Sequence, residues 1–146
     1  MPQLLILLTG LLLSASATAS PADSPVGLWK TFDEDTHKPQ ALIRIGVKNE
    51  RYYGVIVDTL VPGEVLDDLC TRCEDERKNQ PIKGMVFLTG LRRDGEQYVG
   101  GRVLDPDTGD VYHAELHLED QGHKLVMRGY FGIPLLGRSQ TWERVE

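Results

Sequence analysis

About eight short runs rich in β-branched and aromatic residues follow one another along most of this chain, and this rhythm constrains the fold more than any other feature. Turn chemistry, such as Asp94-Gly95, separates the runs, and no stretch has a βαβ rhythm. Alternation of apolar and polar residues predicts strands at residues 27–32, 41–47, 52–59, 84–91, 97–104, 111–118, 124–131 and 139–145. The single long connection, residues 60–83, holds the only two cysteines.

An antiparallel sheet of this size favours closure. Closing the sheet removes its two exposed edges, and eight strands enclose an interior that side chains fill or that holds one small ligand. We therefore predict an all-β fold, an antiparallel up-and-down barrel of about eight strands. A two-sheet sandwich is the alternative.

The amino terminus has the pattern of an export signal. Residues 4–13 form an apolar run, and Ala17-Thr18-Ala19 satisfies the small-residue rule for cleavage after Ala19. The run is too short to span a bilayer. The cleavage site has no cysteine to which a lipid could be attached. We expect a cleaved signal peptide at residues 1–19 and one soluble domain at residues 20–146, in the periplasm or outside the cell, without a membrane anchor.

Charge and cysteine content exclude several classes of protein. The net charge is −6, which argues against nucleic acid as a partner. Two cysteines cannot build a disulfide-dense miniature scaffold, so the stability of the domain must come from an ordinary hydrophobic core. The sequence does not specify an oligomeric state.

Cys70 and Cys73 form the only cysteine pair. A redox pair requires a lowered thiol pKa, but most neighbouring charges are acidic: Asp67, Asp68, Glu74, Asp75 and Glu76. The compartment and these neighbours favour a structural disulfide that shapes the long connection. Redox activity and one half of a metal site remain as alternatives.

No pattern of enzyme chemistry is present. His113, Glu115 and His117 share one face of a predicted strand, but the two histidines lie roughly 13 Å apart there, too far to bind one ion without another strand. Gly-x-Ser-x-Gly is absent, and Gly100-Gly101 precedes no helix, so a bend in a strand explains it better than a phosphate loop. The sequence thus favours a non-enzymatic role without catalytic residues, metal or cofactor.

The last two strands carry the best candidate binding site. If Trp142 points inward, strand parity places Arg138, Gln140 and Arg144 on the same side. Arg128 and Tyr130 share a face of the preceding strand and could join them. A guanidinium inside a barrel needs an anion, such as a ligand carboxylate or phosphate. The predicted ligand-binding residues are therefore Arg128, Tyr130, Arg138, Gln140 and Trp142; alternatively, the arginines pair with acidic side chains or cap strand ends.

Two resemblances support the barrel. Gly27-Leu28-Trp29 resembles the Gly-x-Trp start of lipocalins, in which the tryptophan plugs one end and a basic residue of the last strand packs across it; Arg144 is available for that role. Most of the chain also resembles a family of exported bacterial proteins, domain of unknown function 2147, described as lipocalin-like. The matching pieces are Gly27-Leu28-Trp29, Tyr53-Gly54, Cys70-x-x-Cys73 with Pro81-Ile82, Gly100-Gly101, Leu104-Asp105-Pro106, Gly109, Tyr112, Arg128-Gly129-Tyr130 and residues 135–142.

The family resemblance implies fold and export but no activity, and it supplies no functional residues. We expect an exported lipocalin-like protein that binds a small apolar or amphipathic, anionic ligand. The alternative is an envelope or secreted interaction module whose barrel is packed solid and whose surface contacts another protein.

Overall fold

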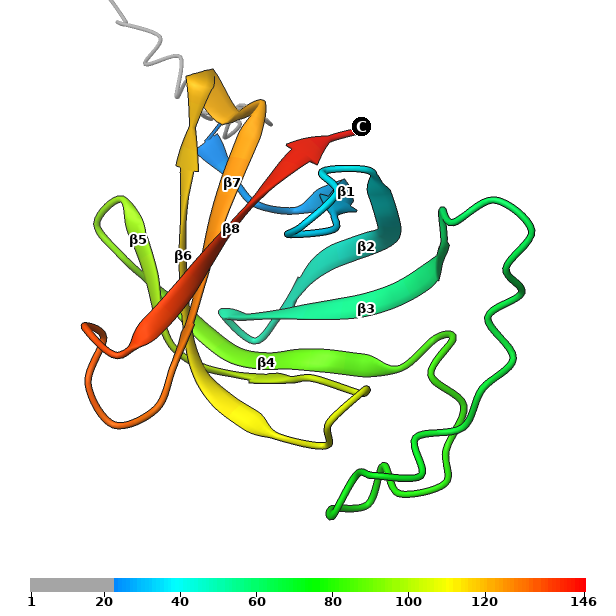
Figure 1. Ribbon diagram of the computed structural model, residues 1–146. Coiled ribbons are helices and arrows are strands. Elements are labelled where there is room, and N and C mark those ends of the chain that lie inside the picture. The colour runs from blue at the N-terminus through cyan, green and yellow to red at the C-terminus, as the bar shows by residue number, and fades with distance from the viewer. Residues whose placement is uncertain (1–22) are drawn as a thin grey trace, which may run out of the picture.

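Eight antiparallel strands close into one barrel in the computed structural model, which describes residues 23–146 (Figure 1). Each strand pairs with its neighbours in the sequence, and the last strand pairs with the first. The strands are β1 (Gly27–Phe32), β2 (Pro39–Lys48), β3 (Arg51–Thr59), β4 (Val86–Asp94), β5 (Gln97–Leu104), β6 (Val111–Glu119), β7 (Lys124–Tyr130) and β8 (Gly137–Arg144). A short 3₁₀ turn, η2 (Asp120–Gly122), joins β6 to β7. The predicted up-and-down barrel is confirmed, and the sandwich alternative is wrong.

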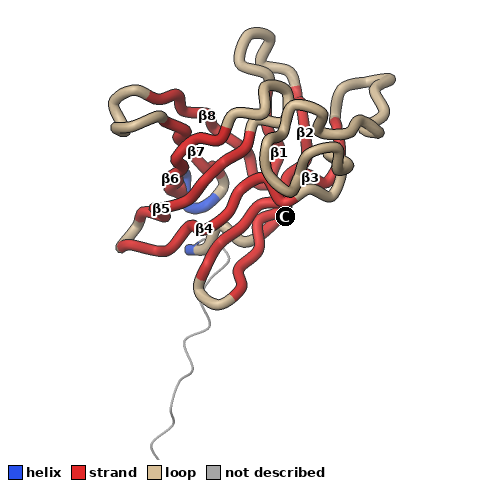
Figure 2. Tube along the Cα trace, turned by 90° about the horizontal axis from the view of Figure 1, so that it is seen from below, coloured by secondary structure: helices blue, strands red, loops and turns tan. Residues whose placement is uncertain are grey.

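The predicted signal peptide, residues 1–19, lies outside the described residues. Within residues 23–146, no helix is long and apolar enough to cross a membrane. In Figure 2, most of the loop backbone, drawn in tan, lies on one side of the strands. The connections at residues 33–38, 60–85, 105–110 and 131–136, which join alternate pairs of strands at one end of the barrel, are longer than those at the other end.

Alternation along the strands builds the core as the sequence predicts. Ile43 and Ile45 of β2 are buried, as are Ala114 and Leu116 of β6, while the residues between them are more exposed. The start of β4 differs from the prediction, which placed it at Gly84. That glycine has a φ of +81° and belongs to the preceding turn, so the strand begins at Val86.

The glycine pair of β5 marks a bend, as predicted. Gly100 has a φ of +75°, and the register of β5 against β6 shifts between Tyr98 and Gly101. A Cβ atom at Gly101 would lie 2.6 Å from Cδ2 of Leu91, so the missing side chain leaves room for this fully buried leucine. The bend therefore helps the sheet to close around its core.

A tryptophan plugs one end of the barrel, which we call the closed end. Trp29 is fully buried, and its Nε1–H donates to the carbonyl oxygen of Pro25 at 2.8 Å. The guanidinium of Arg144, from β8, lies 4.4 Å from the centroid of the Trp29 ring. At the same end, Tyr52 near the start of β3 and Tyr98 near the start of β5 pack edge to face, with centroids 4.9 Å apart. The predicted packing of a basic residue of the last strand across the first tryptophan is confirmed.

Candidate functional site at the loop end

The opposite end of the barrel, which we call the loop end, is ringed by the connections at residues 33–38, 60–85, 105–110 and 131–136. Apolar side chains that point inward below this ring are buried but not sealed. Ile56, Phe87 and Met127 keep 7%, 8% and 5% of their surface exposed, whereas Trp29 and Leu125 keep none. The apolar interior therefore extends to the loop end, where these three side chains keep slightly more of their surface exposed than Trp29 and Leu125 do.

A chain of polar side chains crosses the loop end above this apolar interior. Trp142 of β8 is buried, lies 6.4 Å from Phe87 between ring centroids, and donates its Nε1–H to Oε1 of Gln140 at 3.2 Å. Nε2 of Gln140 donates to Oε1 of Glu34 at 2.9 Å, and Nη1 of Arg138 donates to Oε2 of the same carboxylate at 3.2 Å. Each oxygen of Glu34 thus accepts one donor. Arg138 thus has an acidic partner, as the alternative expected, and its role in ligand binding stays a prediction.

The structure does not bring Arg128 and Tyr130 into this group. In the register of β7 against β8, Arg128 lies opposite Ser139, whereas the inward-pointing Met127 lies opposite Gln140. Side chains directly opposite one another share a face of the sheet, so Arg128 points outward. The prediction that Arg128 and Tyr130 share the interior face with Trp142 is wrong.

On the outer face, both residues have other partners. Arg128 donates through Nε to the carbonyl oxygen of Pro134 at 2.7 Å and through Nη1 to Oγ of Ser139 at 2.9 Å. Tyr130 stacks on His113, with 5.3 Å between ring centroids. Arg128 therefore braces the connection at residues 131–136 instead of lining the interior.

Glu34 is the residue that the sequence prediction missed. It lies in the turn between β1 and β2, and no strand periodicity applies there. The turn is held by Asp33, whose Oδ1 accepts hydrogen bonds from the backbone of Asp35 at 3.1 Å and of Thr36 at 2.7 Å. The hydrogen bond from the backbone of Thr36 is the main reason that the pKa of Asp33 lies below its usual value. An Asx turn of this kind is visible in the sequence, and it fixes the backbone that presents Glu34 to β8.

Aromatic residues form the rim beside this polar chain. Tyr112 begins the inward face of β6, and its ring lies 4.2 Å from that of Phe131, which is half exposed. Burial raises the pKa of the Tyr112 hydroxyl, so the phenol stays neutral at physiological pH. The rim therefore offers uncharged aromatic surface next to a charged pair.

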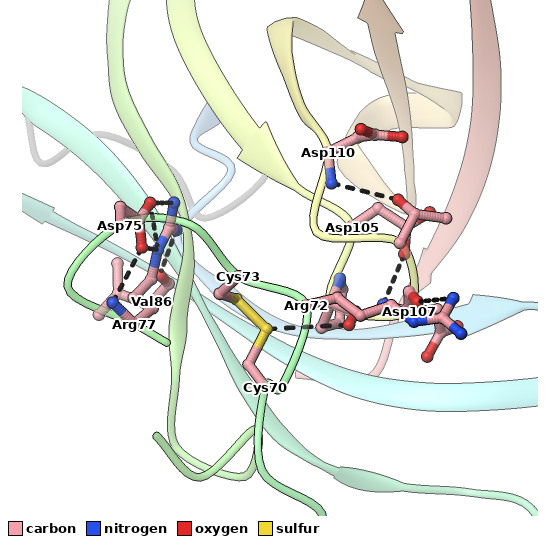
Figure 3. The surroundings of a disulfide bond; sticks show 11 residues. Cys70, Arg72, Cys73, Asp75, Arg77, Val86, Asp105, Asp107 and Asp110 are labelled. Atoms are coloured by element: carbon pink, nitrogen blue, oxygen red, sulfur yellow. Dashed lines mark hydrogen bonds and ion pairs between the residues drawn. A yellow bond between two sulfur atoms is a disulfide. The ribbon is translucent and has the colours of Figure 1, made fainter. Parts of the chain in front are cut away.

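The disulfide fastens the long connection to the barrel (Figure 3). Cys70 and Cys73 are bonded, with 5.5 Å between Cα atoms, and both are fully buried. Sγ of Cys70 lies 3.8 Å from the carbonyl oxygen of Pro106, and Arg72 donates to the carbonyl oxygen of Asp107 at 3.1 Å, both in the turn between β5 and β6. The predicted pairing is confirmed, and complete burial fits a structural clip better than a redox centre.

His113 and His117, which share one face of β6, contact different partners. His113 stacks on Tyr130, whereas Nε2 of His117 lies 3.0 Å from Oε1 of Glu119. Within residues 23–146, no three histidine, cysteine or acidic side chains are grouped so that they could hold a metal ion.

Two surface cavities, of about 570 and 410 Å³, lie outside the barrel along residues 74–89 and beside Phe131. Neither includes Arg138, Gln140 or Trp142.

Comparison with known proteins agrees with this architecture. The family model for an uncharacterised protein conserved in bacteria, DUF2147, matches residues 27–144, from the first residue of β1 to the last of β8. The chain belongs to this family. No curated protein is significantly similar to it in sequence.

One solved structure resembles this DUF2147 protein. Protein HP1028 of Helicobacter pylori, described as belonging to the lipocalin family, superposes with a TM-score of 0.73 at 18% sequence identity, over 84% of each chain. At that identity the similarity concerns the fold alone. The lipocalin-like barrel expected from Gly27-Leu28-Trp29 is thus confirmed, while the ligand-binding residues stay a prediction.

Proposed function

We propose that this DUF2147 protein is exported and binds one small amphipathic molecule at the loop end of its barrel. The observation that carries the proposal is the position of Arg138 and Gln140 directly above the apolar residues Trp142, Phe87 and Met127. Donors at the mouth of an apolar barrel are suited to a ligand with an anionic head and an apolar tail. Eight-stranded barrels are of a size to hold one small ligand.

Two further features support the proposal. The rim formed by Tyr112 and Phe131 gives an apolar tail uncharged aromatic surface at the entrance. Export is supported by the small-residue pattern ending at Ala19 and by the buried disulfide, because disulfides form and persist in oxidising compartments.

Native mass spectrometry of the protein purified from periplasm tests the proposal. We expect an adduct of one small anionic molecule per chain, which denaturation removes. Arg138→Ala should reduce adduct occupancy, because it removes the guanidinium that an anionic head would contact at the mouth of the barrel. Arg102→Ala is the matched control, since Arg102 is exposed and lies opposite Thr89, on the outer face of β5. Equal occupancy in the two variants would refute the site.

One observation favours a second candidate function, as an interaction module. The connection at residues 131–136 carries no charge and exposes Phe131, Ile133, Leu135 and Leu136, the last two by 82% and 68%. The brace from Arg128 to Pro134 holds it in place. Exposed apolar residues gathered on one loop are typical of contact surfaces. Leu135→Ser with Leu136→Ser should then abolish binding to a protein partner while the adduct of the first proposal persists.

A further inference from the structure

The seam between β1 and β8 is joined by backbone pairing only near the closed end. Its register consists of Trp29 opposite Arg144 and Lys30 opposite Glu143, whereas β7 and β8 pair along their full lengths. In Figure 1, the first half of β8, in red, runs apart from β1, in blue. Within residues 23–146, no register pair joins these two strands beyond Lys30 toward the loop end.

Side chains span the seam where the backbone pairing has ended. Glu34, just after β1, reaches Arg138 and Gln140 on β8. These two residues alternate with Ser139, so their side chains lie on the same face of β8 as Trp142. The carboxylate of Glu34 therefore closes the wall of the barrel at the point where the ladder leaves it open.

We propose that Arg138 and Gln140 form a carboxylate-binding site, that Glu34 occupies it when no ligand is bound, and that an amphiphile with a carboxylate head displaces Glu34 to enter through this seam. The inference rests on the proposed function and names the head group and the entrance. The geometry of the contact is that of a bound carboxylate, with one donor from a guanidinium and one from an amide, each on its own oxygen. A ligand carboxylate would accept the same two donors.

The contact with Glu34 is weak enough to be displaced. The side chains of Arg138 and Glu34 are 83% and 43% exposed, and ion pairs with such exposure contribute little to stability. Glu34 can leave by rotating its side chain, because the turn that carries it is held by Asp33 and not by the carboxylate of Glu34. A ligand head then gains the two donors without any change in the strands.

The residues below the site suit an apolar tail. Trp142 gives its only donor to Gln140, and its buried ring packs beside Phe87 in the interior. Met127 of β7 stands opposite Gln140 and completes this wall. A linear tail below the head group would pack against these aromatic and thioether side chains, which the protein itself buries when no ligand is bound.

Calorimetric titration of the full mature domain with dodecanoate, at low salt, tests the inference. Glu34→Gln removes the competing charge and keeps the size of the side chain, so we expect dodecanoate to bind about two- to fivefold more tightly than to the wild type. Arg138→Ala should weaken binding at least tenfold, and Glu34→Gln should then bring no gain. Glu143→Gln is the matched control, because Glu143 also lies at the seam but pairs with Lys30.

Each result separates this inference from the proposed function. If dodecanoate binds the wild type and Glu34→Gln leaves the affinity unchanged, Glu34 is not a competitor, although the barrel still binds a ligand. If Glu34→Gln increases the affinity for the cationic amphiphile dodecyltrimethylammonium as much as that for dodecanoate, the carboxylate assignment is wrong. If neither variant nor the wild type binds dodecanoate, the carboxylate inference fails, and the native mass spectrometry described above decides the proposed function on its own. Hydrogen exchange adds a readout without ligand: amides of residues 138–141 should exchange faster in Glu34→Gln than in the wild type, and equal rates would contradict the closing role of Glu34.

Discussion

Replacing Arg144 by alanine should be among the most destabilising changes outside the apolar core. Its guanidinium lies over Trp29 and donates to three backbone carbonyl oxygens: Nε to Gly122 at 2.7 Å, Nη1 to Val26 at 2.9 Å and Nη2 to Ser24 at 2.6 Å. The chain before β1 and the turn after β6 are therefore tied together by one side chain. Desolvation by burial lowers the pKa of Arg144 from its usual value, yet the group remains charged at any physiological pH.

The size of the effect follows from these contacts. A partly desolvated guanidinium over an indole contributes about 1 to 2 kcal/mol. Each hydrogen bond to a carbonyl contributes about 1 kcal/mol net. We therefore expect Arg144→Ala to lower the free energy of unfolding by about 4 kcal/mol, which in a domain of this length corresponds to roughly 12–20 °C in melting temperature. Arg144→Lys should recover less than half of this, because an ammonium cannot reproduce the planar fork of three donors.

Urea denaturation followed by tryptophan fluorescence measures both variants. Arg44→Ala is the control: Arg44 donates to Oε1 of Glu146 at 3.3 Å, but its side chain is 55% exposed, so we expect a loss below about 1 kcal/mol. If Arg144→Ala were no more destabilising than Arg44→Ala, the closed end would owe its stability to the burial of Trp29 alone, and the reasoning would be refuted.

Three further predictions concern the long connection and its surroundings. Replacing Cys70 and Cys73 by serine should cost about 2 kcal/mol in urea denaturation while the β-type circular dichroism persists, because the closed loop is short; no loss would contradict the clip. Gly109→Ala should destabilise more than Gly84→Ala in a thermal melt: both glycines have a φ near +80°, but only at Gly109 would a Cβ meet the backbone of the disulfide loop. The pKa of Asp75 is lowered chiefly by the hydrogen bond from a neighbouring guanidinium, so its stabilisation is complete above a pH of about 4 and is lost as the pH falls through the lowered pKa. Lowering the pH from 5 to 3 should thus reduce the free energy of unfolding of the wild type more than that of Asp75→Asn. If the free energies of the two proteins fell in parallel with pH, this contribution would be excluded.

Most of the fold could be predicted from the sequence because the barrel is built from local patterns. The alternation in β6 determines which residues point inward, and the turn residues between strands determine where each strand ends. Even the packing of Arg144 over Trp29 was predictable, since it joins the first and last strands of a closed sheet. The start of β4 was harder to predict. The positive φ of Gly84 follows from the path of the long connection, whose sequence has no regular alternation of apolar and polar residues.

The candidate site was predicted only in part, for two physical reasons. On β7, apolar residues occur on both faces, Leu125 and Met127 inward and Val126 outward, so alternation alone did not reveal that Arg128 points out. Glu34 comes from a turn, and its partner Arg138 is 104 residues away along the chain. No pattern within one strand reports such a contact, which depends on how the barrel closes.

The two ends of the barrel separate stability from binding. At the closed end, one arginine binds backbone carbonyls and a fully buried ring, contacts that unfolding must break. At the loop end, Arg138 and Glu34 are held by an exposed ion pair that contributes little to the free energy of unfolding. A change at Arg138 can therefore alter ligand affinity while the melting temperature stays nearly constant, and a change at Arg144 should do the reverse. Side chains that are held only by exposed contacts can therefore rearrange at the loop end without unfolding the barrel.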